Sequence, residues 1–500
     1  MRLHPRLPAL LCLVLSLHAA PTAQAATQPL PPLPAGIPTS AVSVWVAPVE
    51  PTSGTLRPRL EVYPDTLRQM ASLMKLFTTG AALLQWGPAY AWRTELGLGG
   101  PIDAQGRLHG PLYWRASGDP SLDATRLLGL LNHLREAGLQ HLDGDIVVDR
   151  SAFARPPHDP FAFDGEGWRP YNAGPDPLLI AHQSTTLNLR LGADGRWQGR
   201  LSPELAAVRL DLSGLTPDRQ ARACGAWRSR LQLTAQPEGA APGAAVDSRT
   251  AVPPWVLRVS GTLPVACGET NWPLLWEGAD PGDHAERVLR AQWVQWGGTW
   301  RGRLKDGTWP IDLPVWQHWD SPPLAEVVRD INKYSNNVMA RQLMLSLPAV
   351  PGADVALARE TLALQVRGTV SDCQPGTLSV DNGAGLSRTE GSTARCMGQW
   401  LAHLWRSPVM PEFMASLPVP GVDGTTRRWS GASAQAHVKT GSLDGVTGVA
   451  GYVLGNSGQR YIVVAVVNHP AAGQARSWLN AMLSWAQDDQ DEATLAQRPR

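Results

Sequence analysis

A serine and a lysine stand three residues apart in a short segment near the start of the chain, Ser72-Leu73-Met74-Lys75. The pattern there is typical of a helix up to about Leu84, and side chains three apart share a helix face, so the two side chains can meet. A serine hydroxyl is a weak nucleophile until a base removes its proton. Lysine can be that base when its surroundings lower its pKa, which the positive end of the helix dipole favours. The spacing predicts a serine nucleophile with a lysine base; the alternative is a chance pattern on a surface helix.

Lysine usage supports the chemical interpretation. The chain has only four lysines, Lys75, Lys305, Lys333 and Lys439, against forty arginines. Arginine cannot lose its proton in a protein, so it cannot serve as a general base. A lysine retained at position 75 therefore indicates chemistry rather than a solvated charge.

A second motif, Ser335-Asn336-Asn337, lies in a predicted helical stretch, residues 324–346. The Ser335 hydroxyl can pass a proton between Lys75 and a leaving amine. The Asn337 amide can hold both Lys75 and a substrate carbonyl. The alternative is an ordinary polar helix start or turn, and the motif alone is weak.

A third motif, Lys439-Thr440-Gly441-Ser442, stands at the end of a predicted strand. Such a strand can pair with an extended peptide through its backbone. Lys439 offers a positive charge to a substrate carboxylate, Thr440 and Ser442 add hydroxyls, and Gly441 leaves room for close approach. The backbone N–H groups of Ser72 and Ser442 could form an oxyanion hole. The alternative is an exposed lysine at a strand end.

The elements that must position these motifs lie at both ends of the chain. Apolar alternation predicts strands at 40–48, 56–62, 434–440, 449–454 and 461–467, and helical periodicity at 283–296, 324–346, 354–366, 392–405 and 475–485. We expect an α+β fold in which one antiparallel sheet, built from residues 27–95 and 283–500, carries the Ser72 helix. Residues 96–282, mostly β in character, would be an inserted region of two small domains.

Composition and the N-terminal sequence limit the class of protein and its cellular compartment. A formal net charge of +1 without a basic block argues against nucleic-acid binding. Residues 1–26 have the basic start, apolar run and small-residue site of a signal peptide, cleaved near Ala25. No later apolar run has membrane-spanning length, so we expect an exported, periplasmic protein without an integral membrane segment. No cysteine or histidine cluster suggests a metal, and no cofactor is expected.

Four cysteines remain after the leader: Cys224, Cys267, Cys373 and Cys396. An even number in an exported chain predicts two disulfides, and four cysteines allow three pairings. Proximity in sequence favours Cys224 with Cys267 and Cys373 with Cys396. Buried free thiols are the alternative.

Together the three motifs resemble the signature of penicillin-binding proteins and class A β-lactamases. The long insertion after the first motif resembles the D-alanyl-D-alanine carboxypeptidase/endopeptidase family, the class C low-molecular-mass penicillin-binding proteins. The resemblance covers nearly all the mature chain. Further segments that resemble family signatures are residues 117–122, 261–264, 321–324, 381–388 and 421–425.

The resemblance implies a transpeptidase-like catalytic domain acting on peptidoglycan stem peptides. Ser72 would attack the penultimate D-Ala carbonyl and form an acyl-enzyme that water hydrolyses, and β-lactams would acylate the same serine as inhibitors. Arg388 and Tyr171 would line the pocket for the stem-peptide side chain. The other function classes are a non-catalytic peptidoglycan-binding protein on this fold and a β-lactamase or esterase.

Three positions depart from the family pattern. Asn336 replaces an aspartate at a position we expect to be tolerant, and Arg341 stands where a glutamate is common. Residues 167–172 lack the acidic residue that usually precedes the pocket aromatic and would recognise a free amine on the stem peptide. Selectivity for a diaminopimelate side chain is therefore open.

Overall fold

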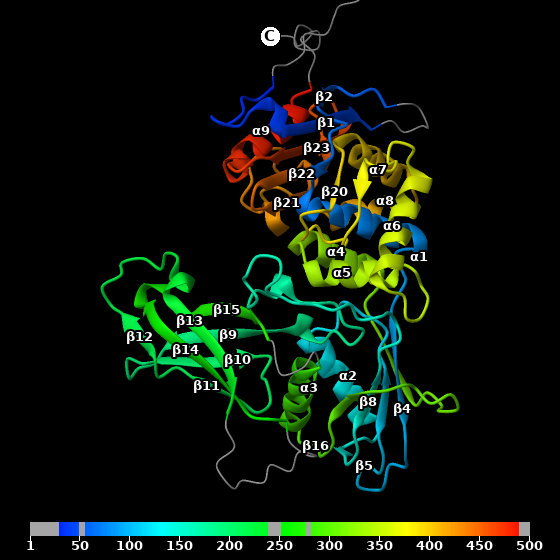
Figure 1. The fold of residues 1–500 in the computed structure, drawn as a ribbon, viewed down its shortest axis with the longest axis vertical. Helices are drawn as coiled ribbons and strands as arrows, with labels where there is room; N and C mark the ends of the chain where they lie inside the picture. The colour runs from blue at the N-terminus through cyan, green and yellow to red at the C-terminus, as the bar shows by residue number, and fades with distance from the viewer. Residues whose placement is uncertain (1–29, 50–55, 239–251, 277–281, 490–500) are drawn as a thin grey trace, which may run out of the picture.

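The two ends of the chain meet in one antiparallel sheet of five strands, ordered β2-β1-β23-β22-β21 (Figure 1). The computed structural model describes residues 30–49, 56–238, 252–276 and 282–489. The strands are β1 (Val42–Pro48), β2 (Leu60–Val62), β21 (Ala436–Leu443), β22 (Val446–Leu454) and β23 (Arg460–Asn468). The predicted leader, residues 1–26, lies outside the described residues. The expected sheet from both ends of the chain is confirmed.

Both faces of this sheet are covered by helices. In β1, Trp45 and Ala47 pack into one apolar core while Val44 and Val46 pack into another, as the two-residue repeat of a strand requires. The first core is completed by α1 (Lys75–Trp86), α4 (Leu324–Tyr334), α5 (Asn337–Ser346), α6 (Val355–Thr369), α7 (Ala394–Arg406) and α8 (Met410–Ser416); the second is completed by α9 (Arg476–Gln487). Because helices cover both faces, the central strands are buried almost throughout.

The predicted single helix over 324–346 is wrong in one respect, because the chain breaks at Ser335. Helix α4 ends at Tyr334, Ser335 takes a left-handed conformation with φ 58°, and α5 begins at Asn337. The Asn336 side chain accepts a hydrogen bond from the Met339 N–H and so caps α5. The second motif therefore lies in the turn between two helices.

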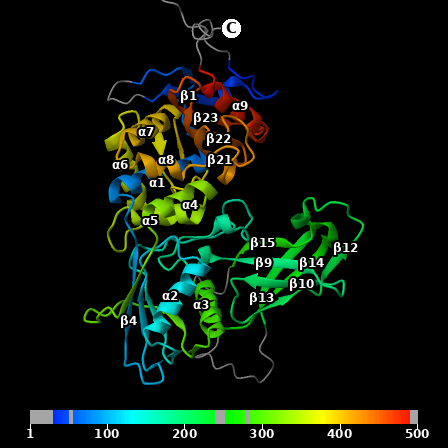
Figure 2. The same ribbon diagram turned by 180° about the vertical axis from the view of Figure 1, so that it is seen from behind.

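The inserted region forms two lobes, which lie below the catalytic part in the views of Figures 1 and 2. One lobe packs α2 (Ala124–Glu136) and α3 (Asp283–Gln295) on the sheet β17-β8-β6-β4-β18, beside the smaller sheet β16-β7-β5. Its strands are β4 (Arg93–Leu98), β5 (Arg107–Leu108), β6 (Leu112–Arg115), β7 (His141–Leu142), β8 (Ile146–Asp149), β16 (Thr299–Trp300), β17 (Leu304–Asp306) and β18 (Gln317–Asp320).

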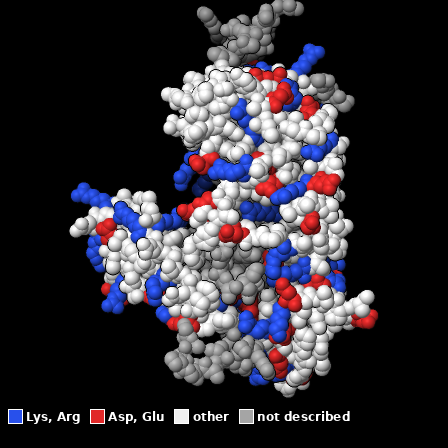
Figure 3. All heavy atoms as spheres, viewed as in Figure 1, with Lys and Arg blue, Asp and Glu red and all other residues white. Residues whose placement is uncertain are grey.

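The other lobe is all β. Its strands are β9 (Ser184–Leu191), β10 (Trp197–Ser202), β11 (Val208–Asp211), β12 (Leu215–Asp218), β13 (Leu231–Pro237), β14 (Trp255–Pro264) and β15 (Thr270–Leu275). In Figure 3 a hollow separates this lobe from the catalytic part, and basic and acidic side chains are interspersed over the visible face.

The packing bears on where the inserted region ends. Val288, Leu289 and Trp293 of α3 are buried in the core of the inserted region rather than in the catalytic cores. Strand β18 pairs with β4. The expected division at residue 282 stays a prediction, and this packing favours a boundary nearer residue 320.

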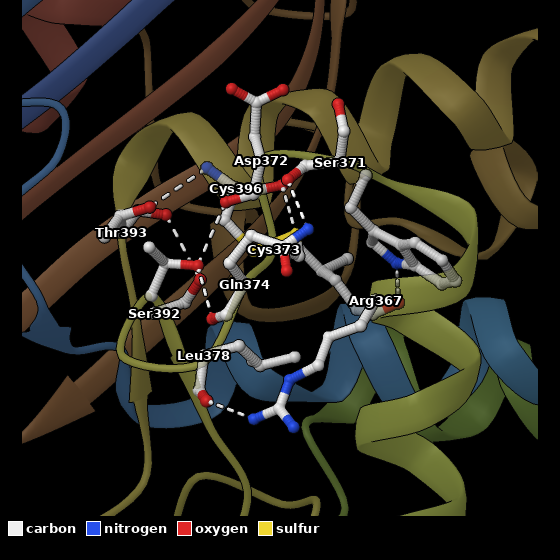
Figure 4. Close-up of a disulfide and its surroundings, with 12 residues drawn as sticks. Arg367, Ser371, Asp372, Cys373, Gln374, Leu378, Ser392, Thr393 and Cys396 are labelled. Carbon is white, nitrogen blue, oxygen red and sulfur yellow. Dashed lines mark hydrogen bonds between the residues drawn. A yellow bond between two sulfur atoms is a disulfide. The ribbon is translucent and has the colours of Figure 1, made fainter.

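Both expected disulfides are present, Cys224–Cys267 in the inserted region and Cys373–Cys396 in the catalytic part. The second joins the segment after α6 to the first turn of α7, where the Thr393 hydroxyl accepts from the Cys396 N–H (Figure 4). The loop that this disulfide closes contains residues 381–390, which contact the motif of Ser72 and Lys75. It also contains the short strands β19 (Leu378–Ser379) and β20 (Gly391–Ser392). Strand β20 pairs with β3 (Arg68–Gln69), just before Ser72.

Candidate active site

Ser72 stands in a short 3-10 turn, Ala71–Met74, that leads directly into α1. The sequence pattern predicted one continuous helix here, and the structure differs because Ala71 has a left-handed backbone, φ 48°. A Cβ on Gly385 would lie 1.8 Å from the Ala71 carbonyl oxygen, so the 381–390 segment lies directly against this turn. The 381–390 segment therefore packs against the turn that carries Ser72, immediately before α1 begins.

Lys75 is fully buried at the start of α1. Its Nζ lies 3.1 Å from the Ser72 Oγ, and it donates to the Asn337 Oδ1 at 2.6 Å and the Ala384 carbonyl oxygen at 2.5 Å. Three groups from three parts of the chain thus surround the amine. The Ala384 carbonyl was missed in the sequence analysis, because a backbone acceptor has no side-chain signature.

The turn between α4 and α5 presents two side chains of the second motif to the site. The Ser335 Oγ accepts a hydrogen bond from the Lys439 Nζ at 2.9 Å. The Asn337 amide reaches Lys75 through its oxygen, and its Nδ2 lies 3.4 Å from the Tyr171 carbonyl oxygen. The Asn336 side chain points instead to the first turn of α5, which it caps. Aspartate and asparagine cap helices about equally well, so the cap gives a physical reason for either residue at this position.

The third motif lies within β21, an edge strand whose only partner among the described strands is β22. Lys439 is fully buried and also donates to the Thr440 carbonyl oxygen at 2.8 Å. The Thr440 and Thr425 hydroxyls lie 2.7 Å apart. A Cβ on Gly441 would lie 2.6 Å from the Met70 carbonyl oxygen, so only glycine lets β21 lie this close to the Ser72 turn. Ser442 is exposed.

Burial controls the charge of both lysines. Loss of hydration holds the pKa of Lys75 well below its ordinary value, and the positive charges of Lys439 and Arg341 lower it further, while Glu390 opposes them. Burial also lowers the pKa of Lys439 to about 7. An uncharged amine at position 75 is the form that can take a proton from Ser72.

The two residues expected to contact a substrate side chain lie at the exposed rim. The Arg388 guanidinium donates to the Asp444 carbonyl oxygen at 2.7 Å and lies over the Phe163 ring, 5.3 Å from its centre. The Tyr171 hydroxyl donates to the Asp164 carboxylate at 2.7 Å. Burial, and then this carboxylate, raises the pKa of Tyr171 to about 12.

Asp164 corrects the expectation that no acidic residue accompanies the aromatic. Sequence reasoning missed it because Asp164 lies outside residues 167–172; the chain turns back on itself and brings Asp164 to Tyr171 from seven residues upstream. Asp164 also holds Asn172 through its side-chain amide. A carboxylate therefore lies beside the expected pocket residue.

The structure thus gathers the predicted residues into two adjoining networks. Ser72, Lys75 and Asn337 form one, and Ser335 and Lys439 form the other, joined through the turn 335–337. Within the described ranges, no group of three or more metal-ligating side chains occurs. No helix there is both long and apolar enough to span a membrane.

Comparisons with known proteins fit this geometry. The sequence profile of the D-Ala-D-Ala carboxypeptidase 3 (S13) family matches residues 60–488. The chain is 28% identical over 444 residues to a D-alanyl-D-alanine carboxypeptidase of Actinomadura sp., covering 81% of this chain and 74% of the relative. It is 24% identical over 425 residues to the D-alanyl-D-alanine carboxypeptidase DacB of Haemophilus influenzae, covering 83% of each.

The fold is also similar to a solved structure. The crystal structure of penicillin binding protein 4 from Haemophilus influenzae superposes with a TM-score of 0.67 at 21% identity, covering 91% of this chain and 96% of that one. A second structure of that protein, complexed with a β-lactam, gives a TM-score of 0.65 at 20% identity, covering 90% and 96%. The expected α+β fold with its large insertion is thereby confirmed.

Proposed function

Because the chain belongs to the D-Ala-D-Ala carboxypeptidase 3 (S13) family of serine-type carboxypeptidases, the class C low-molecular-mass penicillin-binding proteins, we propose that it cleaves peptidoglycan stem peptides through an acyl-enzyme on Ser72. The bond would be that between the last two D-alanines. The proposal extends to cross-linked peptides, in which the leaving amine belongs to a neighbouring stem, so that the enzyme is also an endopeptidase. β-Lactams would acylate the same serine.

The observation that carries the proposal is the set of partners around Lys75. Two of its three neighbours, the Asn337 Oδ1 and the Ala384 carbonyl oxygen, can only accept hydrogen bonds. A neutral amine satisfies both with its two N–H groups. Its lone pair is then left for the third neighbour, the Ser72 hydroxyl. This is the arrangement that a general base needs.

The first half-reaction follows from these positions. Lys75 takes the Ser72 proton while Oγ attacks the penultimate D-Ala carbonyl, and the backbone N–H groups of Ser72 and Ser442 would stabilise the oxyanion. Removing one such donor typically costs roughly 2.7–4 kcal/mol of transition-state stabilisation. Ser335, which accepts a hydrogen bond from Lys439, would pass the proton from Lys75 to the leaving amine as the C–N bond breaks. The acyl group then remains as an ester on Ser72. Water then hydrolyses the ester and restores Ser72.

Substrate binding would use the edge of β21 and the rim of the site. An extended peptide can pair with the edge of β21 that no other described strand covers, and the Lys439 ammonium would attract its terminal carboxylate. Arg388 and Tyr171 would contact the stem-peptide side chain. The Asp164 carboxylate beside Tyr171 supplies a negative charge that a free amine, such as that of diaminopimelate, could pair with.

The substrate implies a place outside the cytoplasm. Peptidoglycan lies beyond the inner membrane, and the leader expected over residues 1–26 would export the chain. We therefore place the mature protein in the periplasm, cleaved near Ala25. N-terminal sequencing of the secreted protein tests this, and a mature chain that retains Met1 would contradict it.

Incubation with defined muropeptides tests the activity itself. Pure protein is given uncross-linked and cross-linked muropeptides, and the products are weighed by mass spectrometry beside the Ser72→Ala variant. We expect loss of the terminal D-Ala from the first and separation of the second into monomers, both absent from the variant. Unchanged substrates in both samples would contradict the proposal.

A further inference from the structure

A buried glutamate that the reaction itself does not use lies behind Lys75. Glu390 is 1% exposed, and its carboxylate accepts hydrogen bonds from the backbone N–H groups of Asp381 at 3.1 Å, Gly383 at 2.8 Å and Gly385 at 2.8 Å. A carboxylate loses its hydration on burial and needs such donors in exchange. Three donors from one short loop make Glu390 the centre about which residues 381–385 fold.

That loop contacts the candidate site at three points. The Ala384 carbonyl accepts from Lys75, and the Gly383 carbonyl accepts from the Thr78 hydroxyl at 2.7 Å, one turn further along α1. Gly385 lies against Ala71, immediately before Ser72. The position of the Glu390 carboxylate therefore sets the position of one of the two carbonyl groups that orient the Lys75 amine.

A half-buried arginine, Arg341, lies on α5 one turn after Asn337, the residue that accepts from the same amine. The Arg341 guanidinium donates to the Ala173 carbonyl oxygen at 3.0 Å. The charged groups that act on Lys75 come from three elements: Lys439 from β21, Arg341 from α5 and Glu390 from the loop before β20. Asp381, which forms an ion pair with Arg359, acts in turn on both Glu390 and Arg341.

We propose that Glu390 is a positioning residue, which holds the 381–385 loop against Lys75, and that Glu390 and Arg341, which carry opposite charges, balance the charge around the lysine amine. The inference rests on the proposed function, because it concerns the step in which Lys75 takes the Ser72 proton. Neither residue touches the substrate. Glu390 acts through the loop, and both act through the electric field at the amine.

The pair makes opposite predictions for two single variants. Glu390 favours the charged form of Lys75, so Glu390→Gln lowers the lysine pKa and moves the acidic limb of the acylation profile to lower pH. Arg341 disfavours the charged form, so Arg341→Gln moves the limb to higher pH. We expect shifts of at least about half a pH unit, since nearby charges move a pKa by roughly one to three units. The double variant should lie between the two.

Loop positioning adds a second readout. In Glu390→Gln one carboxylate oxygen becomes an NH₂ group, which cannot accept from the loop. We expect its maximal acylation rate to fall on the order of 10- to 100-fold, because small misplacements of catalytic groups slow reactions by about this factor. The control is Glu286→Gln, since Glu286 is also buried and pairs with Arg290 and Arg303 in the inserted region. It should lower the melting temperature without moving the acidic limb.

The experiment is the second-order rate of acylation by a fluorescent penicillin from pH 5 to 10, on variants checked by thermal melting. Limbs that move in opposite directions support the pair. Limbs that coincide with the wild type, or that both move the same way, overturn it. Should Glu390→Gln not fold, Arg341→Gln alone decides by the direction of its shift. A wild-type protein that is not acylated at any pH refutes the proposed function instead.

Discussion

The Nζ of Lys75 lies 3.1 Å from the Oγ of Ser72, and the lysine is fully buried with carbonyl oxygens as its other two partners. Burial makes the ammonium form unfavourable, and the two carbonyl groups fix the direction of the remaining lone pair. The proposed chemistry therefore depends on this one side chain being able to lose a proton.

Replacing Lys75 by arginine tests that requirement. A guanidinium keeps its charge in proteins, so Lys75→Arg retains the cation and removes the base. We expect acylation by a fluorescent penicillin to slow by roughly 10²- to 10⁴-fold, the usual contribution of a general base. Lys305→Arg is the control, because Lys305 is an exposed partner of Asp145 and should react normally. An active Lys75→Arg enzyme would refute the role of the lysine.

The charge of Lys439 predicts how substrate binding varies with pH. Its pKa is lowered to about 7 by burial, so the free enzyme loses the ammonium as the pH rises through that value. The ammonium is the form that attracts a carboxylate, so KM for a peptide ending in D-Ala-D-Ala should rise above pH 7. The corresponding peptide amide should show no such rise. Equal pH dependence of the two KM values would exclude this role for Lys439.

Gly385 should not tolerate a side chain. A Cβ there would lie 1.8 Å from the Ala71 carbonyl oxygen, and the backbone is left-handed at φ 77°. We expect Gly385→Ala to displace the Ser72 turn and slow acylation more than tenfold. The matched control is Gly376→Ala, also left-handed at φ 92° but with no atom within 4 Å. That variant should lose only about 1–2 kcal/mol of folding free energy, the cost of a left-handed backbone at a residue with a side chain, and should be acylated normally. Equal effects on acylation would contradict the contact argument.

Removing either disulfide should lower stability, but only removal of Cys373–Cys396 should also slow acylation. Removing Cys373–Cys396, whose partners are 23 residues apart, should lower the free energy of unfolding by about 3 kcal/mol and slow acylation, because the bridge encloses the loop against Lys75. Removing Cys224–Cys267 should destabilise the inserted region without slowing acylation. Paired cysteine-to-serine variants, compared by denaturant unfolding and acylation rate, measure both. An equal loss of acylation in the two variants would count against the placement of the loop.

Much of this architecture could be predicted because it depends on local patterns. Alternating apolar residues marked the strands at both ends, and the three-residue spacing of Ser72 and Lys75 survives although the turn between them is a 3-10 turn rather than an α-helix. The disulfide pairing followed proximity in sequence and is confirmed. These features are encoded within short stretches of chain.

What could not be predicted depends on contacts between distant segments. The break at Ser335 was missed because residues 324–346 are apolar at helical spacing throughout, and only the left-handed turn separates the two helices. Ala384 acts through its backbone carbonyl and Glu390 acts by accepting from backbone N–H groups, so the resemblance of residues 381–388 to a family signature did not assign either role. Asp164 reaches Tyr171 across a turn from outside residues 167–172, where the family pattern places the acidic residue.

Locating the covalent adduct tests the central claim most directly. The protein is incubated with benzylpenicillin, digested, and mapped by mass spectrometry, beside a Ser72→Ala variant with an unchanged melting temperature. We predict one penicilloyl group per chain, on the peptide that contains Ser72, and none on the variant. An adduct on another residue, or equal labelling of Ser72→Ala, would contradict the assignment of Ser72 as the nucleophile.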